Sequence, residues 1–205
     1  GKRPALIHVT GNTEIDALRY TVRDDYSHPI LDGLNGGTLL LMTIHRRENL
    51  GEPMRSIFRA VRRFSHDFPE IRVVYPVHLN PQVQTPAREI LGGAERVTLI
   101  DPLEVTDFHN FLSRAKLVLS DSGGVQEDAA GLGKPLLVAR DVTERPEGLD
   151  AGTLKLVGTD EDAVYSNLAE LHSNHALYAK MASAPNPFGD GFASAKIADA
   201  ILTGG

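Results

Sequence analysis

The stretch LVLSDSGGVQED, residues 117–128, joins a strand pattern to a helix pattern through a turn of small polar residues and glycines. Residues 117–119 are apolar and with Ser120 have the length of a buried strand, and residues 125–132 have the composition of a helix. Glycines between them let the backbone turn sharply and approach a ligand closely. The stretch therefore predicts a strand–turn–helix unit with polar groups at the carboxyl end of the strand.

The same alternation of strand and helix patterns continues on both sides of this stretch. We expect strands at residues 38–45, 71–77, 96–100, 117–120, 135–139 and 152–157. We expect helices at residues 54–64, 83–91, 105–115, 125–132, 160–171, 176–182 and 193–202, a turn-rich connector at 24–37 and a loop at 140–152. This order predicts an α/β fold with a doubly wound, mostly parallel, Rossmann-like sheet, in which ligands bind beyond the carboxyl ends of the strands.

The composition is that of an ordinary soluble domain. Its 205 residues are enough for one full core, and 21 basic against 27 acidic side chains give a net charge of −6, which argues against nucleic-acid binding. No run reaches the roughly 18 apolar residues that span a bilayer. The absence of cysteine excludes disulfides and thiol catalysis. The chain opens in mid-pattern with GKRPALIHVTGN, so we expect it to be a piece of a longer protein.

The SDSGG turn is open to two interpretations. The hydroxyl of Ser122 and the free amides at Gly123 and Gly124 could hold a phosphate at the start of the helix. Alternatively, Asp121 or Ser122 is a plain helix cap and the glycines form a tight turn. The acids Glu127 and Asp128 that follow could accept from ribose hydroxyls, or could only favour the positive end of the helix dipole.

Other strand ends carry charged residues as well. The cluster His45-Arg46-Arg47-Glu48 could bind phosphate and transfer a proton, or could be a solvated arginine pair with Glu48 as counter-ion and His45 as a cap. His78 follows the next strand and by itself is more typical of a structural residue. No histidine spacing resembles a metal site, and no polar partners are evident for His8, His28, His66, His109, His172 and His175.

Taken together and in this order, several motifs resemble one family over nearly the whole chain. They are TGNTEIDAL (10–18), HRRENLG (45–51), YPVHLNP (75–81), DPLEVTDFHNF (101–111), SDSGGVQED (120–128), GKPLLVARDVTERPEG (133–148), GTLKLVGTD (152–160) and NPFGDGFAS (186–194). The chain resembles the bacterial non-hydrolysing UDP-N-acetylglucosamine 2-epimerases. The resemblance implies the C-terminal half of a two-domain GT-B architecture, with residues 1–37 as a lead-in and connector from an absent N-terminal domain and residues 38–205 as the UDP-binding domain.

The resemblance also implies an activity and its partners. The family interconverts UDP-GlcNAc and UDP-ManNAc by eliminating and re-adding UDP, without a cofactor or a metal, in the cytoplasm, for cell-surface polysaccharides. Its catalytic carboxylates lie in the other half, so the chain alone should be inactive, and the full-length protein should be a homodimer that needs neither nucleic acid nor membrane. The alternatives are a nucleotide-sugar glycosyltransferase half and a non-catalytic nucleotide-sugar binding module.

Individual site residues follow from the same resemblance. It implies a catalytic role for His45 and a second, allosteric UDP-GlcNAc site at Arg46 and His78. The UDP-binding residues that it implies are Ser122, Gly123 and Gly124 for the diphosphate, Phe108 near the uracil, Asp128 at the ribose, and Arg145 in the cleft. One position departs from the family pattern, because Asp128 stands where the family usually has the longer glutamate.

Overall fold

The computed structural model describes residues 7–203, and within them six strands form a single sheet in which every neighbouring pair is parallel. The strands are β1 (Thr38–Thr43), β2 (Ile71–Pro76), β3 (Val97–Ile100), β4 (Leu117–Ser120), β5 (Leu136–Val138) and β6 (Leu154–Leu156). Their order across the sheet is β3-β2-β1-β4-β5-β6. This is the doubly wound Rossmann order, so the predicted fold class is confirmed.

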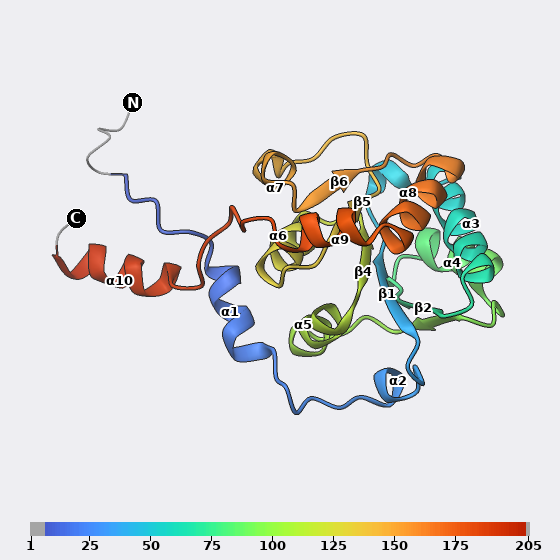
Figure 1. Cartoon of the computed structure of the whole chain (residues 1–205), viewed down its shortest axis with the longest axis horizontal. Helices are drawn as coiled ribbons and strands as arrows, with labels where there is room; N and C mark the ends of the chain where they lie inside the picture. The colour runs from blue at the N-terminus through green and yellow to red at the C-terminus, as the bar shows by residue number, and fades with distance from the viewer. Residues whose placement is uncertain (1–6, 204–205) are drawn as a thin grey trace.

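Helices cover both faces of the sheet (Figure 1). They are α1 (Thr13–Thr21), α2 (Pro29–Asp32), α3 (Glu52–Asp67), α4 (Pro81–Leu91), α5 (Val105–Arg114), α6 (Gly123–Gly131), α7 (Pro146–Ala151), α8 (Glu161–Ser173), α9 (His175–Ala182) and α10 (Ala193–Thr203), with a 3₁₀ turn η2 (Arg47–Asn49). α3, α4 and α8 pack on one face, and α5 and α6 pack on the other. None of the helices in the described part of the chain is long and apolar enough to cross a membrane.

The central strand β1 shows why its sequence is apolar almost throughout. Successive side chains of a strand point to opposite faces, and here both faces are covered by helices. Leu40 and Met42 join the core under α3, α4 and α8, whereas Leu39 and Leu41 join the core under α5 and α6. A strand buried on both sides therefore needs a continuous apolar run.

Every predicted strand and helix is present, and the described residues contain three further helices that were not predicted. α7 lies in the segment predicted as a loop, where Pro146 occupies the first turn and Gly152 ends the helix in the left-handed region at φ 83°. α2 lies in the predicted connector and is a single turn that also begins with proline. α1 is capped by Asn12, whose side chain accepts from the N–H of Glu14.

α1 is fastened to the rest of the domain by its apolar face. Ile15 and Leu18, three residues apart, are buried, and α1 packs against α5, α6 and α10. Gly131 at the end of α6 permits this approach, because a Cβ atom there would lie 2.7 Å from a methyl group of Leu18. The apolar face of α1 is thereby held against the end of α6.

Candidate functional site

The site begins where β1 and β4 end side by side. These strands are neighbours at the point where the strand order reverses, and Thr43 pairs in register with Ser120. Their hydroxyl oxygens are 2.7 Å apart. The chain leaves β1 toward His45 and leaves β4 toward Asp121, so two of the predicted polar strand ends meet at the topological switch point, where open α/β sheets bind ligands.

The buried side chain of Asp121 fixes the segment that follows β1 by accepting hydrogen bonds from it. Its side chain is fully buried, and the backbone N–H groups of His45 and Arg46 donate to its carboxylate at 3.0 and 2.8 Å. The side-chain amide of Asn49 donates to the same carboxylate at 3.0 Å. The alternative in which Asp121 caps the helix is therefore wrong, because its acceptors are used to fix the turn that follows β1.

The start of α6 has free donors facing outward. Ser122 is the N-cap residue by backbone geometry, with φ −88° and ψ 135°, but its hydroxyl makes no capping bond within the described residues. Ser122 therefore occupies the cap position that the plain-cap interpretation gave it, but its side chain does not cap the helix. Gly124 is exposed, and a Cβ atom added to it would meet no protein atom within 4 Å. Unpaired amide groups, a dipole end and open space together suit an anion.

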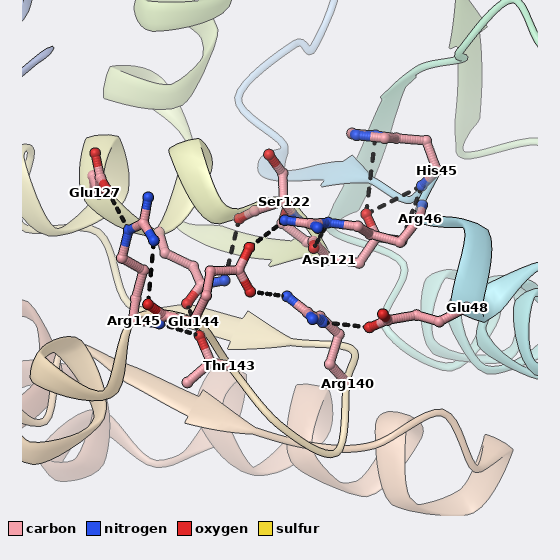
Figure 2. A network of polar contacts seen from close by, with 12 residues as sticks. His45, Arg46, Glu48, Asp121, Ser122, Glu127, Arg140, Thr143, Glu144 and Arg145 are labelled. Carbon is pink, nitrogen blue, oxygen red and sulfur yellow. Dashed lines mark hydrogen bonds and ion pairs between the residues drawn. The ribbon is translucent and has the colours of Figure 1, made fainter.

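A chain of ion pairs crosses this helix start (Figure 2). The guanidinium of Arg46 pairs with Glu144, which also pairs with Arg140, and Arg140 pairs in turn with Glu48. The interpretation of Glu48 as a local counter-ion for the arginine pair is wrong, because its partner is the distant Arg140. Arg140 and Glu144 come from the segment after β5, whereas Arg46 and Glu48 follow β1, so residues from two strand ends form one network.

The two acids of α6 have separate environments. Neither Glu127 nor Asp128 lies in the first turn, so the interpretation that they serve the helix dipole is wrong. Glu127 pairs with Arg145 and accepts from the side-chain amide of Asn12 (Figure 2 shows the arginine contact). Arg145 is thus held against α6, on the same side of the network as Ser122.

Asp128 faces His109, a histidine for which no polar partner was predicted from the sequence. His109 is 1% exposed, and its Nδ1 lies 2.8 Å from the hydroxyl oxygen of Thr21. Its Nε2 lies 3.7 Å from Asp128 and 3.8 Å from Glu14. The expectation that His109 lacks converging polar partners is wrong, because α1 brings two polar side chains and α6 brings one to the same place.

Two features of this group concern ligands. The Oδ1 atom of Asp128 is buried and has no hydrogen-bond partner among the described residues. Donor atoms of Glu14, His109 and Asp128 lie within 4.8 Å of one another, so these side chains could hold a metal ion. The absence of a metal from the expected site stays a prediction.

The remaining predicted residues lie on either side of α6. His78 is exposed and stacks on His45, with ring centroids 5.4 Å apart. A hollow of about 540 Å³ adjoins them, lined by His45, Arg46, Arg47, Glu48, His78 and Asn80. Phe108 is half-buried on α5, next in sequence to His109. The structure therefore groups His45, Arg46 and His78 at one side of the helix start and places Phe108 and Asp128 at the other.

The environment of His45 favours its neutral form. Burial lowers the pKa of His45, and His78 and Arg46 lower it further, against the opposing effect of Asp121. A neutral imidazole can accept a proton near neutral pH and can donate a hydrogen bond, whereas an imidazolium can only donate.

This lowered pKa predicts a change of stability with pH. Because the ordinary value of 6.5 applies to the unfolded chain, the unfolded chain binds more protons than the folded chain as the pH falls through 6.5. We expect the free energy of unfolding to fall between about pH 7 and about pH 5, and His45→Gln to flatten this fall. Urea titrations at several pH values measure it, with the exposed His175→Gln as control; equal slopes for His45→Gln and the parent chain would contradict it.

Comparison with known proteins connects this geometry to a family. The family model described as UDP-N-acetylglucosamine 2-epimerase matches residues 1–202. The chain belongs to the UDP-N-acetylglucosamine 2-epimerase family. The UDP-N-acetylglucosamine 2-epimerase of Bacillus subtilis is 55% identical to it over 201 residues, which are 98% of this chain and 53% of that protein. The resemblance inferred from the motifs is thus confirmed.

Solved structures of the epimerase family agree with this assignment. The S. aureus MnaA–UDP co-structure is 50% identical, with a TM-score of 0.95 over 98% of this chain and 55% of that one. The UDP-GlcNAc 2-epimerase from Neisseria meningitidis bound to UDP-GlcNAc is 39% identical, with a TM-score of 0.87 over 95% of this chain and 55% of that one. The chain therefore spans about half the length of the relatives that it matches, and its fold is that of one Rossmann-like half of a GT-B epimerase.

Proposed function

We propose that this chain is the UDP-binding half of a UDP-GlcNAc 2-epimerase, which interconverts UDP-GlcNAc and UDP-ManNAc by eliminating and re-adding UDP. The observation that carries the proposal is the position of the start of α6 at the switch point of the sheet. This helix start presents the backbone amides of Gly123 and Gly124 and the hydroxyl of Ser122, which makes no capping bond within the described residues. The relatives whose structures contain UDP and UDP-GlcNAc support this choice of ligand.

The diphosphate would lie against this helix start. Backbone N–H groups and the dipole favour its charge, and the side chains of Ser122 and His45 would add donors. In an elimination, the departing UDP gains negative charge, so groups preorganised around the diphosphate stabilise the transition state more than the bound substrate. We assign His45 to this step, because a neutral imidazole next to the departing oxygen can donate a hydrogen bond to it or receive a proton.

The nucleoside would extend along α5 and α6. We assign Asp128 to the ribose, because its buried Oδ1 has no donor and a ribose hydroxyl would supply one. The Nε2 atom of the buried His109 lies 3.7 Å from this carboxylate. We place the uracil near Phe108 and assign Arg145 to the edge of the UDP site, in contact with Glu127.

A second nucleotide-sugar site is proposed at Arg46 and His78. The hollow lies beside the stacked rings of His45 and His78 and is lined by cationic and polar groups. A second UDP-GlcNAc bound there would lie next to the catalytic diphosphate and could act as an allosteric activator.

The rest of the enzyme is also a proposal. Since the chain spans about half of its relatives, we place the catalytic carboxylates in an N-terminal half, with residues 1–37 leading into the UDP-binding domain of residues 38–205. Residues 1–6 of this lead-in are outside the described residues, and α1 within it packs on α5 and α6. We further propose a homodimer at full length and a cytoplasmic location, which suits an enzyme acting on nucleotide sugars.

Two measurements test this function. Calorimetric titration should show weak binding of UDP to this chain, and incubation with UDP-GlcNAc should give no UDP-ManNAc, because the proposed carboxylates are absent. Joining the chain to the N-terminal half of the Bacillus subtilis relative should produce UDP-ManNAc, identified by mass spectrometry and NMR. Transfer of GlcNAc to an acceptor by the joined protein would favour the glycosyltransferase alternative, and binding without any turnover would favour the binding module.

A further inference from the structure

A carboxylate lies at the place proposed for the diphosphate. A Cβ atom added to Gly123 would be 2.6 Å from Oε1 of Glu144 and 3.4 Å from Nη2 of Arg46. The ion pair between Glu144 and Arg46 therefore crosses the first turn of α6 directly above its backbone (Figure 2). An anion and its cationic partner therefore lie at this helix start.

Arg46 is fixed at this place independently of Glu144. Its Nε atom donates to the backbone carbonyl of Asp121 at 3.1 Å, and its backbone N–H donates to the buried carboxylate of the same residue. The guanidinium is thereby aimed at the start of α6 from the end of β1. Guanidinium groups bind phosphate oxygens with two parallel hydrogen bonds, so the same geometry suits a diphosphate.

Glu144 has a second partner that can keep it charged. Burial opposes its charged form, but its own backbone N–H together with Arg140 and Arg46 outweighs this and lowers the pKa of Glu144. Arg140 is buried and would still neutralise Glu144 after Arg46 had been taken by a ligand. Moving the carboxylate aside therefore leaves no unpaired buried charge, whose cost would otherwise prevent the movement.

We propose that Glu144 is a surrogate anion for the diphosphate, that a bound diphosphate takes Arg46 from it, and that Arg46 is accordingly a ligand of the UDP diphosphate in addition to any role at the second site. This inference rests on the proposed function, because it uses the start of α6 as the diphosphate site. Two anions at one helix end repel each other, so each UDP that binds must displace the Glu144 carboxylate. Glu144 thus sets the affinity for UDP and helps the product to leave.

Removing this charge while keeping the size of the side chain and one acceptor oxygen tests the inference. We expect Glu144→Gln to bind UDP and inorganic pyrophosphate about tenfold more tightly than the parent chain, the size of effect expected when one like charge beside a bound anion is removed. Glu147→Gln, which removes an exposed acid of the same region, is the matched control and should leave both affinities unchanged. Calorimetry of all three proteins at constant ionic strength measures this.

A double-mutant cycle separates a specific exchange from a general effect of charge. Arg46→Gln should weaken binding of both ligands, and Glu144→Gln should gain much less in that background, because the cation to be released is absent. Equal UDP affinities for Glu144→Gln and Glu147→Gln would overturn the inference while leaving the proposed function intact. Binding of UDP only by Glu144→Gln would support the inference, and failure of every variant to bind either ligand would overturn both.

Discussion

Asp121→Ala should lower the free energy of unfolding by about 3–5 kcal/mol, because it leaves several buried donors without an acceptor. The carboxylate is fully buried and accepts from the backbone N–H groups of His45 and Arg46 and from the amide of Asn49. Alanine removes every one of these acceptors and opens a small cavity beside them. Urea unfolding followed by circular dichroism measures the change.

Two further variants show whether the lost stability comes from the hydrogen bonds of the Asp121 carboxylate. Asp121→Asn keeps the shape and one acceptor oxygen but turns an NH₂ group toward donors, so its loss should be about half as large. Asp162→Ala is the control, because its exposed ion pair with Arg63 should contribute less than about 1 kcal/mol. An Asp121→Ala chain as stable as Asp162→Ala would refute the view that this carboxylate holds the two strand ends together.

Gly124→Ala should abolish UDP binding, with a loss of about a hundredfold or more, while the protein remains folded. The added methyl group would meet no protein atom within 4 Å, so it would project into the space proposed for the diphosphate. Phosphate oxygens must come within about 3 Å of a backbone N–H group, and a methyl group at this position prevents that approach. Calorimetric titration with UDP gives the affinity.

The thermal midpoint of Gly124→Ala shows whether this variant is still folded. Alanine is a better helix former than glycine, so the thermal midpoint of Gly124→Ala should be equal to or slightly above that of the parent chain. Ser122→Ala serves as the companion variant, because it removes only one hydroxyl donor and should weaken UDP binding by about tenfold. If Gly124→Ala bound UDP as tightly as the parent chain, the diphosphate could not lie against the first turn of α6.

Most of the fold follows from local patterns. The strands and longer helices were predictable because apolar residues recur with the period of a strand or a helix over their whole length. α7 was missed because its six residues are too few to show a period, and only its proline and closing glycine mark it. α1 was missed although Asn12, Ile15 and Leu18 have the spacing of a capped amphipathic helix, a signal that the sequence did contain.

The candidate site was predictable as a set of strand ends, but not as a set of contacts. His45, Ser122 and Gly124 were predicted to lie near one another because polar residues and glycines directly after buried strands of a parallel sheet meet at one edge, and their role in binding stays a prediction. The ion-pair partners of the acidic side chains, in contrast, could not be predicted from the sequence. Glu48 was assigned to the wrong partner, since charges close in sequence need not be close in space, and its arginine is 92 residues away.

The sequence by itself determined the α/β class and the family, because each depends on short motifs and on the period of apolar residues. Only the tertiary structure decided which charges meet. Asp121 holds the turn at His45 across 76 residues, and Glu144 reaches Arg46 across 98. Such pairs leave no local pattern, because a side chain meets its partner only after the strands have taken their order in the sheet.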